Sequence, residues 1–196
     1  MEDIIVFNIR WMLLNVTLAL IPLVFGGLMV KAKRIYIKSL FFVIWFAFVP
    51  NTIYVVTDII HIPQQWNQTI PIERPLLLFQ YLMLEIIGLL SFISAVYLFE
   101  KLLFTLGRKK KKNKFLISHV IFVFNFIIGF GVVLGRIQKL NSWEIFSDAE
   151  KTLSKSFEVL SSLELILLVI FFGLLGNFLY FFFKKNVVIV FKKYIK

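Results

Sequence analysis

A polar stripe runs through the second long apolar segment of this chain. Within residues 48–61, four polar or ionisable side chains interrupt a largely apolar run: Asn51, Tyr54, Asp58 and His61. On an α-helix they fall at roughly 0°, 300°, 340° and 280°, so they share a stripe about 80° wide. Hydrocarbon offers no hydrogen-bond partners, so such groups face protein or a water-filled cavity. The stripe therefore predicts a polar site inside a helix bundle.

The pair Asp58 and His61 is the candidate for catalysis. Histidine titrates near neutral pH, and Asp58 or Tyr54 could orient its imidazole for general acid–base chemistry. The alternative is structural, because Asp58 could form an ion pair with Arg136, whose loss would leave a buried charge uncompensated. The chain has no cysteine, and its other histidine, His119, falls at the far end of another apolar segment. We therefore predict no metal site and no cofactor.

Further polar residues are predicted to gather beside the stripe, as a substrate-binding or structural cluster. One lies on the stripe's own segment and four follow the fourth apolar segment: Thr57, then Arg136, Asn141, Ser142 and Trp143.

Glu85 is predicted to lie near mid-membrane, where an ionised carboxylate costs at least ~2.5 kcal/mol. It is protonated, or it pairs with a donor such as Asn51 or Tyr54, or it lines a wet cavity. Conduction of protons or cations is the functional interpretation, and a neutral hydrogen-bonded acid is the structural one.

Composition requires a membrane to hold these groups. The chain is 60% hydrophobic, contains 24 phenylalanines in 196 residues and has a mean hydropathy of +0.88. We expect an all-α integral membrane protein with a single domain over residues 1–196. Five apolar runs are long enough to cross about 30 Å of hydrocarbon: 12–30, 39–60, 76–99, 115–134 and 160–183.

Two features inside these runs shape the predicted bundle. Pro50 either kinks the second span or breaks it into two helices, because proline cannot donate a backbone hydrogen bond. Gly131 and Gly135 have the spacing of close helix packing. Glycines inside a spanning helix exclude a dinucleotide-binding fingerprint, which requires a preceding strand.

Charge predicts the orientation. Segments 31–38, 100–114 and 184–196 hold 16 of the 22 Lys and Arg residues, so the positive-inside rule places them in the cytoplasm. The N-terminus and loops 61–75 and 135–159 then lie outside, and part of the second loop is predicted to form an interfacial amphipathic helix. We expect the basic loops to contact anionic lipid headgroups rather than nucleic acid, in a multi-pass protein of the bacterial cytoplasmic membrane.

The sequence resembles the DUF1361 family, a group of bacterial membrane proteins with no assigned activity. The resemblance covers most of residues 12–145, and it implies a membrane architecture but no reaction, substrate or partner. It rests on Asn15 with Leu18-Ala19-Leu20-Ile21-Pro22, Phe48-Val49-Pro50-Asn51, Tyr54, Thr57-Asp58, His61, Gly88-Leu89-Leu90-Ser91, Gly135-Arg136 and Asn141-Ser142-Trp143.

Two classes of function fit these observations. The first is an enzyme that acts on a lipid or lipid-linked substrate at the outer leaflet, with His61 as the acid–base group and Arg136 holding an anionic headgroup. The second is a non-catalytic membrane protein, either a small transport component or a subunit of a membrane complex. The sequence contains no established catalytic motif, and no internal repeat of the kind common in transporters is apparent.

Overall fold

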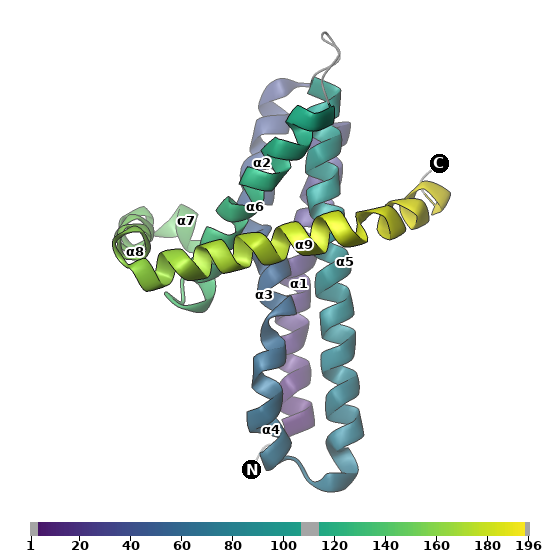
Figure 1. Ribbon diagram of the computed structural model, residues 1–196, viewed down its shortest axis with the longest axis vertical. Coiled ribbons are helices and arrows are strands. Elements are labelled where there is room, and N and C mark those ends of the chain that lie inside the picture. Colours follow the sequence, from purple (N-terminus) through teal and green to yellow (C-terminus); the bar gives the residue numbers. More distant parts are fainter. Residues whose placement is uncertain (1–3, 107–113, 195–196) are drawn as a thin grey trace.

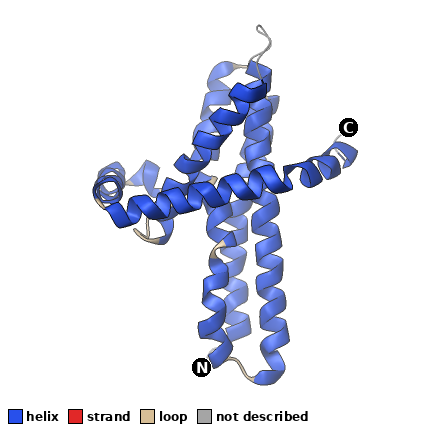
Figure 2. Ribbon diagram, in the orientation of Figure 1, coloured by secondary structure: helices blue, strands red, loops and turns tan. Residues whose placement is uncertain are grey.

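The computed structural model describes residues 4–106 and 114–194, and it contains only helices and their connections within that part of the chain (Figure 2). The elements are α1 (Ile4–Lys31), α2 (Ile35–Phe48), α3 (Pro50–Val56), the 3-10 helix η1 (Asp58–His61), α4 (Ile62–Gln68), the 3-10 helix η2 (Pro71–Glu73), α5 (Arg74–Leu106), α6 (Lys114–Arg136), α7 (Glu144–Ser147), α8 (Ala149–Ser161) and α9 (Leu163–Tyr194).

Within the described residues, five helical segments are long and apolar enough to cross a membrane: Ile4–Lys31, Ile35–Val56, Pro71–Leu106, Lys114–Arg136 and Leu163–Lys185. In lipid a helix satisfies its own backbone hydrogen bonds, which explains why such apolar sequences fold this way. The predicted all-α, multi-pass architecture is confirmed. The predicted orientation stays a prediction, and most of its basic run falls at 107–113, outside the described residues.

The site depends on three parallel columns of helix. One is α1, another is α5, and the third is the kinked column formed in succession by α2, α3, η1 and α4 (Figure 1). The N-terminus lies at the α4 end of these columns. Helix α6 packs against α3 and α9, while α9 crosses the columns steeply instead of running alongside them (Figure 1).

The short length of α6 decides where its last residue lies. It has 23 residues against 33 in α5, or about 35 Å against about 50 Å at 1.5 Å per residue. It therefore ends partway along the columns, and α7 and α8 lie beside α3, well away from α4 (Figure 1). Arg136, at the end of α6, is thereby brought to the junction of α3 and η1.

The kinked column is interrupted by two prolines. At Pro50 the preceding residue keeps helical dihedrals (φ −58°, ψ −32°), so the interruption is a kink and the chain does not change direction. The α-helical geometry assumed for the stripe does not extend to His61, because Asp58–His61 is a 3-10 helix. Pro63 has no N–H for the carbonyl of Ile59, which accepts instead from Ile62.

Glycines let α6 approach its neighbours closely. A Cβ placed on Gly131 would lie 2.4 Å from Cγ of Pro50, and one on Gly129 would lie 2.7 Å from the backbone nitrogen of Gly173 on α9. The close packing predicted at Gly131 is confirmed, with the kink itself as its partner. Gly135 is different, since its added Cβ would meet other atoms no closer than 3.8 Å.

Replacing Gly131 by alanine should force Pro50 and α6 apart, because the added methyl group has no room. We expect Gly131→Ala to lower the free energy of unfolding by about 1–3 kcal/mol. Thermal unfolding of the detergent-solubilised protein measures the change. Gly27→Ala is the matched control, since a Cβ there meets nothing within 4 Å. Equal stability of the two variants would contradict the close contact at the kink.

Candidate functional site

The centre of the site is an ion pair between Asp58 and Arg136. Nη2 of Arg136 lies 2.5 Å from Oδ1 of Asp58, and the amide of Asn15 on α1 donates to Oδ2 at 3.1 Å. Asp58 is only 1% exposed and Arg136 only 11%. The predicted ion pair is confirmed, and it joins the kinked column to both α6 and α1.

Arg136 also caps the end of α3. Because that helix stops at Val56, the carbonyl of Tyr54 lies in its last turn, where it accepts from the backbone N–H of Thr57 at 3.0 Å. Nη2 of Arg136 donates to this carbonyl at 3.0 Å, and the hydroxyl of Thr57 donates to it at 2.7 Å. The guanidinium carbon lies 4.2 Å from the centroid of the Tyr54 ring, which adds a cation–π contact.

His61 lies beside this cluster but is not hydrogen-bonded to Asp58. Its Nε2 is 4.0 Å from Oδ1 of Asp58, which is too long for a hydrogen bond, and the ring packs edge-on against Trp11 with centroids 6.1 Å apart. The His61 side chain is 44% exposed. Among the described residues, no group of three or more His, Asp or Glu side chains is placed to hold a metal ion.

The loop after α6 is tied to the kink by Asn51. Its amide donates to the Ser142 hydroxyl at 2.8 Å and to the carbonyl of Phe48 at 3.1 Å. The neighbouring Asn141 donates through both its backbone and side-chain nitrogens to Glu144. Trp143 is 45% exposed and is the N-cap residue of α7. The loop thus reaches the stripe through Ser142 and not through Trp143.

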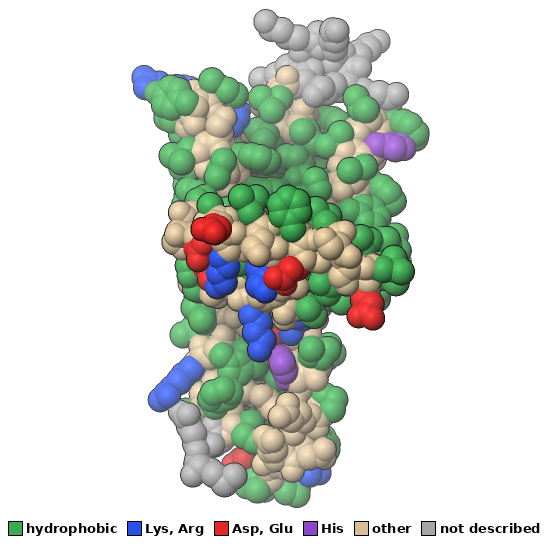
Figure 3. Space-filling view, turned by 90° about the vertical axis from the view of Figure 1, so that its left-hand side faces the viewer, with side chains coloured by type: hydrophobic (Ala, Val, Ile, Leu, Met, Phe, Trp, Pro, Cys, Tyr) green, Lys and Arg blue, Asp and Glu red, His purple; other side chains and the backbone are tan. Residues whose placement is uncertain are grey.

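Helix α8 presents charges on one face. Glu144, the first residue of α7, pairs with Lys151 of α8, and Lys155 pairs with Glu158 within α8. Charged side chains of both signs gather in a band on this side of the molecule, beside a mostly apolar surface (Figure 3). The hydrogen bond from Lys151, followed by that from the Asn141 backbone, lowers the pKa of Glu144. Exposed apolar side chains occupy another face of the helix: Leu153, Phe157 and Leu160. The predicted amphipathic helix is present, and its interfacial position stays a prediction.

Asn51, one of the donors considered for Glu85, does not pair with it. The amide of Asn51 is used by Ser142 and Phe48, and the carboxylate of Glu85 lies instead near the Ile59 backbone N–H. The 3-10 turn of η1 exposes this N–H, which an α-helix would have used internally. Oε1 of Glu85 is buried with no hydrogen-bond partner among the described residues.

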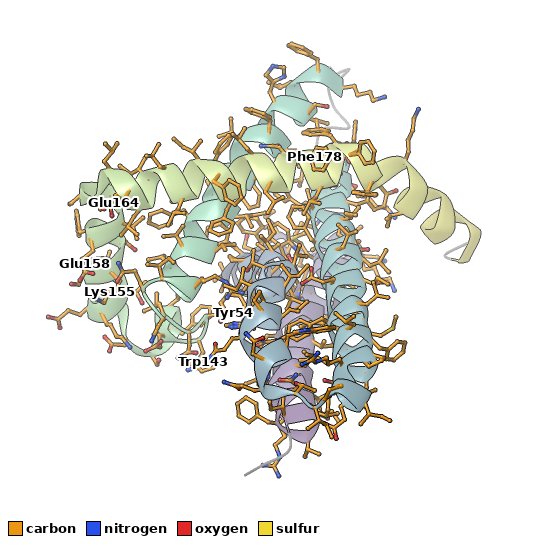
Figure 4. All side chains as sticks on the ribbon, turned by 60° about the horizontal axis from the view of Figure 1, so that its bottom comes forward. Tyr54, Trp143, Lys155, Glu158, Glu164 and Phe178 are labelled. Carbon is orange, nitrogen blue, oxygen red and sulfur yellow. The ribbon has the colours of Figure 1, made fainter. Side chains whose placement is uncertain are left out.

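Two cavities flank Tyr54. The first, called the apolar cavity below, has a volume of about 350 Å³ and lies between α2–α3, α6 and the loop after α6. Its lining is apolar except near Asn51, Asn141, Ser142 and Thr152. Figure 4 shows Tyr54 on the side of the kinked column that faces this loop, where Trp143 is also labelled.

The second cavity, called the polar cavity, has a volume of about 210 Å³. It opens between the kinked column and α1, and its lining residues are Phe7, Trp11, Asn15, Tyr54, Asp58, His61 and Gln65. Tyr54 is thus shared by the two cavities.

Comparison with known families agrees with this architecture. The family model described as "Protein of unknown function (DUF1361)" matches residues 14–179, which is most of the chain. The chain belongs to the DUF1361 family. No curated protein and no solved structure matches it. Membership therefore supports a multi-pass membrane protein without assigning an activity.

Sequence reasoning missed the contribution of α1 to the site of this DUF1361 protein. Asn8, Trp11 and Asn15 are spaced i, i+3 and i+7, so they form a polar stripe on one face of α1. Asn8 exchanges two amide hydrogen bonds with Gln65 on α4, at 2.7 and 2.9 Å. That spacing was the signal that could have identified α1 as the opposite wall.

A second polar cluster was also missed. On α5, Glu100 is buried, and it accepts from the Tyr180 hydroxyl at 2.5 Å and from the Lys184 ammonium at 2.6 Å, both on α9. Deeper between α6 and α9, Asn125 donates to Asn177 at 2.9 Å. These contacts fix how α9 crosses the bundle, and they lie away from both cavities.

Neutralising either partner of the central ion pair should leave a buried charge without compensation. We expect Asp58→Asn or Arg136→Gln each to lower the free energy of unfolding by about 3–5 kcal/mol. The double variant should lose less than the sum of the two, with a coupling of about 0.5–3 kcal/mol. Unfolding in detergent measures all three variants.

The exposed pair Lys155–Glu158 on α8 provides the control for this double-mutant cycle. Lys155→Gln should change the unfolding free energy by no more than about 1 kcal/mol, because exposed pairs are weak. Strictly additive losses at Asp58 and Arg136 would show that the two side chains do not depend on each other.

Proposed function

We propose that this protein binds a lipid or a lipid-linked molecule, with its apolar chain in the apolar cavity and its polar headgroup in the polar cavity. The observation that carries the proposal is the order of the cavity linings along the kinked column. The apolar cavity uses Phe46 to Tyr54, and the polar cavity uses Tyr54, Asp58, His61 and Gln65. An amphiphile lying along this column would meet apolar and then polar surroundings in that order.

The depth of the cavities supports the same proposal. Sixteen residues of α1 separate Asn15 from Lys31, a rise of about 24 Å. Since Asn15 holds Asp58, the polar cavity begins about 24 Å from the basic end of α1, toward the far boundary of a hydrocarbon core about 30 Å thick. If the basic segments lie in the cytoplasm, this boundary belongs to the outer leaflet of the cell membrane.

The size and lining of the apolar cavity also fit a ligand. Its volume falls within the range of about 300–1,000 Å³ that is typical of small-molecule sites, and a few polar groups lie at one side of an otherwise apolar wall. Asn51 and Ser142 already pair with each other there, so the cavity offers mainly hydrophobic contact.

His61 is the group we propose for chemistry on the headgroup. It lines the polar cavity, its imidazole is half-exposed, and imidazole is the side chain most often used in general acid–base catalysis. Asp58 lies 4.0 Å away, which is too far to orient the ring by a hydrogen bond in the unliganded protein. Catalytic hydrogen bonds often tighten only when the substrate is bound.

The alternative function is binding without catalysis, as in a small transport component or a subunit of a membrane complex. One observation favours it: both oxygens of Asp58 already have partners, Arg136 and Asn15. The ion pair thus already has a structural role that needs no bound headgroup. Turnover of the bound lipid distinguishes the two functions.

Filling the apolar cavity should block binding. Gly135 lines this cavity, and a Cβ added there would lie no closer than 3.8 Å to neighbouring atoms. Gly135→Leu should therefore place its isobutyl group in the cavity without a backbone clash. We expect labelling by a diacylglycerol lipid with a diazirine in one acyl chain to fall by about tenfold, the effect of about 1.4 kcal/mol. Peptide mass spectrometry locates and counts the label.

Gly27→Leu is the matched control, because open space surrounds Gly27 on α1. It should leave labelling of the α2–α3 and α6 peptides unchanged. Equal labelling of these peptides in wild type and Gly135→Leu would show that the lipid only surrounds the protein.

Replacing His61 should separate chemistry from binding. If the protein is an enzyme, His61→Gln should bind the lipid as wild type does while leaving it chemically unchanged. The wild-type protein, incubated with a total lipid extract in vesicles, should alter the mass of a lipid class over time. The rate of this conversion should be lower by about 100-fold or more in His61→Gln. An unaltered lipid pool with wild type would favour the non-catalytic function.

A further inference from the structure

The polar cavity continues into a second one along α4. This neighbouring cavity has a volume of about 260 Å³ and shares Phe7, His61 and Gln65 with the polar cavity. Together the two form a continuous surface, called the amide groove below. Its lining residues are Ile4, Phe7, Trp11, Asn15, Tyr54, Asp58, His61, Gln64, Gln65 and Gln68.

The charge of the amide groove does not favour an anionic guest. None of its lining residues is Lys or Arg, and the one carboxylate, Asp58, is already compensated by Arg136. Phosphate and carboxylate groups are bound in proteins by guanidinium, ammonium or arrays of N–H donors directed at them. A phosphorylated headgroup would therefore meet no Lys or Arg side chain in the lining of the groove.

The hydrogen-bonding groups of the groove match hydroxyl groups instead. An amide offers donors and an acceptor side by side, and a hydroxyl is likewise both donor and acceptor. Gln64 and Gln68 lie one turn apart on the same face of α4, and their side chains make no hydrogen bond within the part of the chain that the structure describes. Both amides are exposed and free to bind.

The remaining wall of the groove is held rigidly. Gln65 exchanges hydrogen bonds with Asn8 and also accepts from the Tyr81 hydroxyl at 3.1 Å. The indole N–H of Trp11 donates to Asn8 at 2.9 Å, which fixes the orientation of the ring. Trp11 thus lines the groove with a ring of fixed orientation, and aromatic rings offer apolar surface suited to the C–H groups of a sugar ring.

We propose that the amide groove binds a neutral polyhydroxylated headgroup, the glycosyl or polyol part of a lipid whose chain occupies the apolar cavity. This inference rests on the proposed function and adds the class of headgroup to it. Gln64 and Gln68 supply the hydrogen bonds, Trp11 supplies the stacking surface, and His61 lies between the two parts of the groove, next to the sugar hydroxyls.

A comparison of two photoreactive lipids tests which class of headgroup the protein binds. The full-length protein is reconstituted in phosphatidylcholine vesicles with monoglucosyl diacylglycerol or phosphatidylglycerol, each carrying the same diazirine-bearing acyl chain. We expect the glucosyl lipid to label the α2–α3 and α6 peptides about fivefold more strongly, the effect of one hydrogen bond to a neutral group. Gln64→Ala combined with Gln68→Ala should abolish this preference.

Gln138→Ala is the matched control, since Gln138 follows α6 and lies outside both parts of the groove. It should retain the full preference. The exposed positions of Gln64 and Gln68 on α4 make loss of folding unexpected, and the thermal unfolding midpoint of each variant verifies this.

Two outcomes would overturn the inference, and they differ in what they say of the proposed function. Equal labelling by both lipids, still reduced by Gly135→Leu, would retain lipid binding and reject a polyhydroxylated headgroup. Labelling by neither lipid above the level of Gly135→Leu would reject both. Preference for phosphatidylglycerol, or a preference unchanged by the two Gln→Ala substitutions, would also reject the amide groove as the headgroup site.

Discussion

A carboxylate buried among membrane helices must be compensated, and the structure is arranged around that requirement at Asp58. Arg136 provides the charge and Asn15 the remaining hydrogen bond, so three separate helical segments meet at one side chain. Arg136 is available there because α6 is short and ends partway along the columns. Removal of either charge would leave the other desolvated, which makes the position of α6 dependent on the pair.

The same contacts divide the space around Tyr54. Its carbonyl and ring both contact Arg136. Tyr54 lines both the mainly apolar cavity and the cavity that combines Asn15, Asp58, His61 and Gln65 with Phe7 and Trp11. The kink at Pro50 brings Gly131 into contact and helps to fix α6 against the column. Elements that stabilise the fold thus also shape the proposed lipid site, and stability and binding are expected to be linked at these residues.

Much of this arrangement was accessible from sequence. Hydropathy predicted the five spans, the stripe predicted which face of the second span is polar, and opposite charges predicted that Asp58 meets Arg136. The 3-10 turn at Asp58–His61 was not predicted, because it arises from Pro63, beyond the apolar run. The partners of Glu85 and the contribution of α1 were missed since they depend on which helices become neighbours, and periodicity within one helix carries no information on that. The steep crossing of α9 depends likewise on pairs such as Glu100 with Tyr180.

A crystal structure grown from a lipid mesophase doped with monoglucosyl diacylglycerol would test the central claim most directly, since it would show what occupies the two cavities. We predict continuous density for one amphiphile, with its chain between Pro50 and Gly135 and its headgroup past Tyr54 against His61 and Gln64. Asp58 and Arg136 should remain paired behind it. Cavities that contain only water, or lipid density confined to the outer surface of the helices, would contradict a lipid site built around this ion pair.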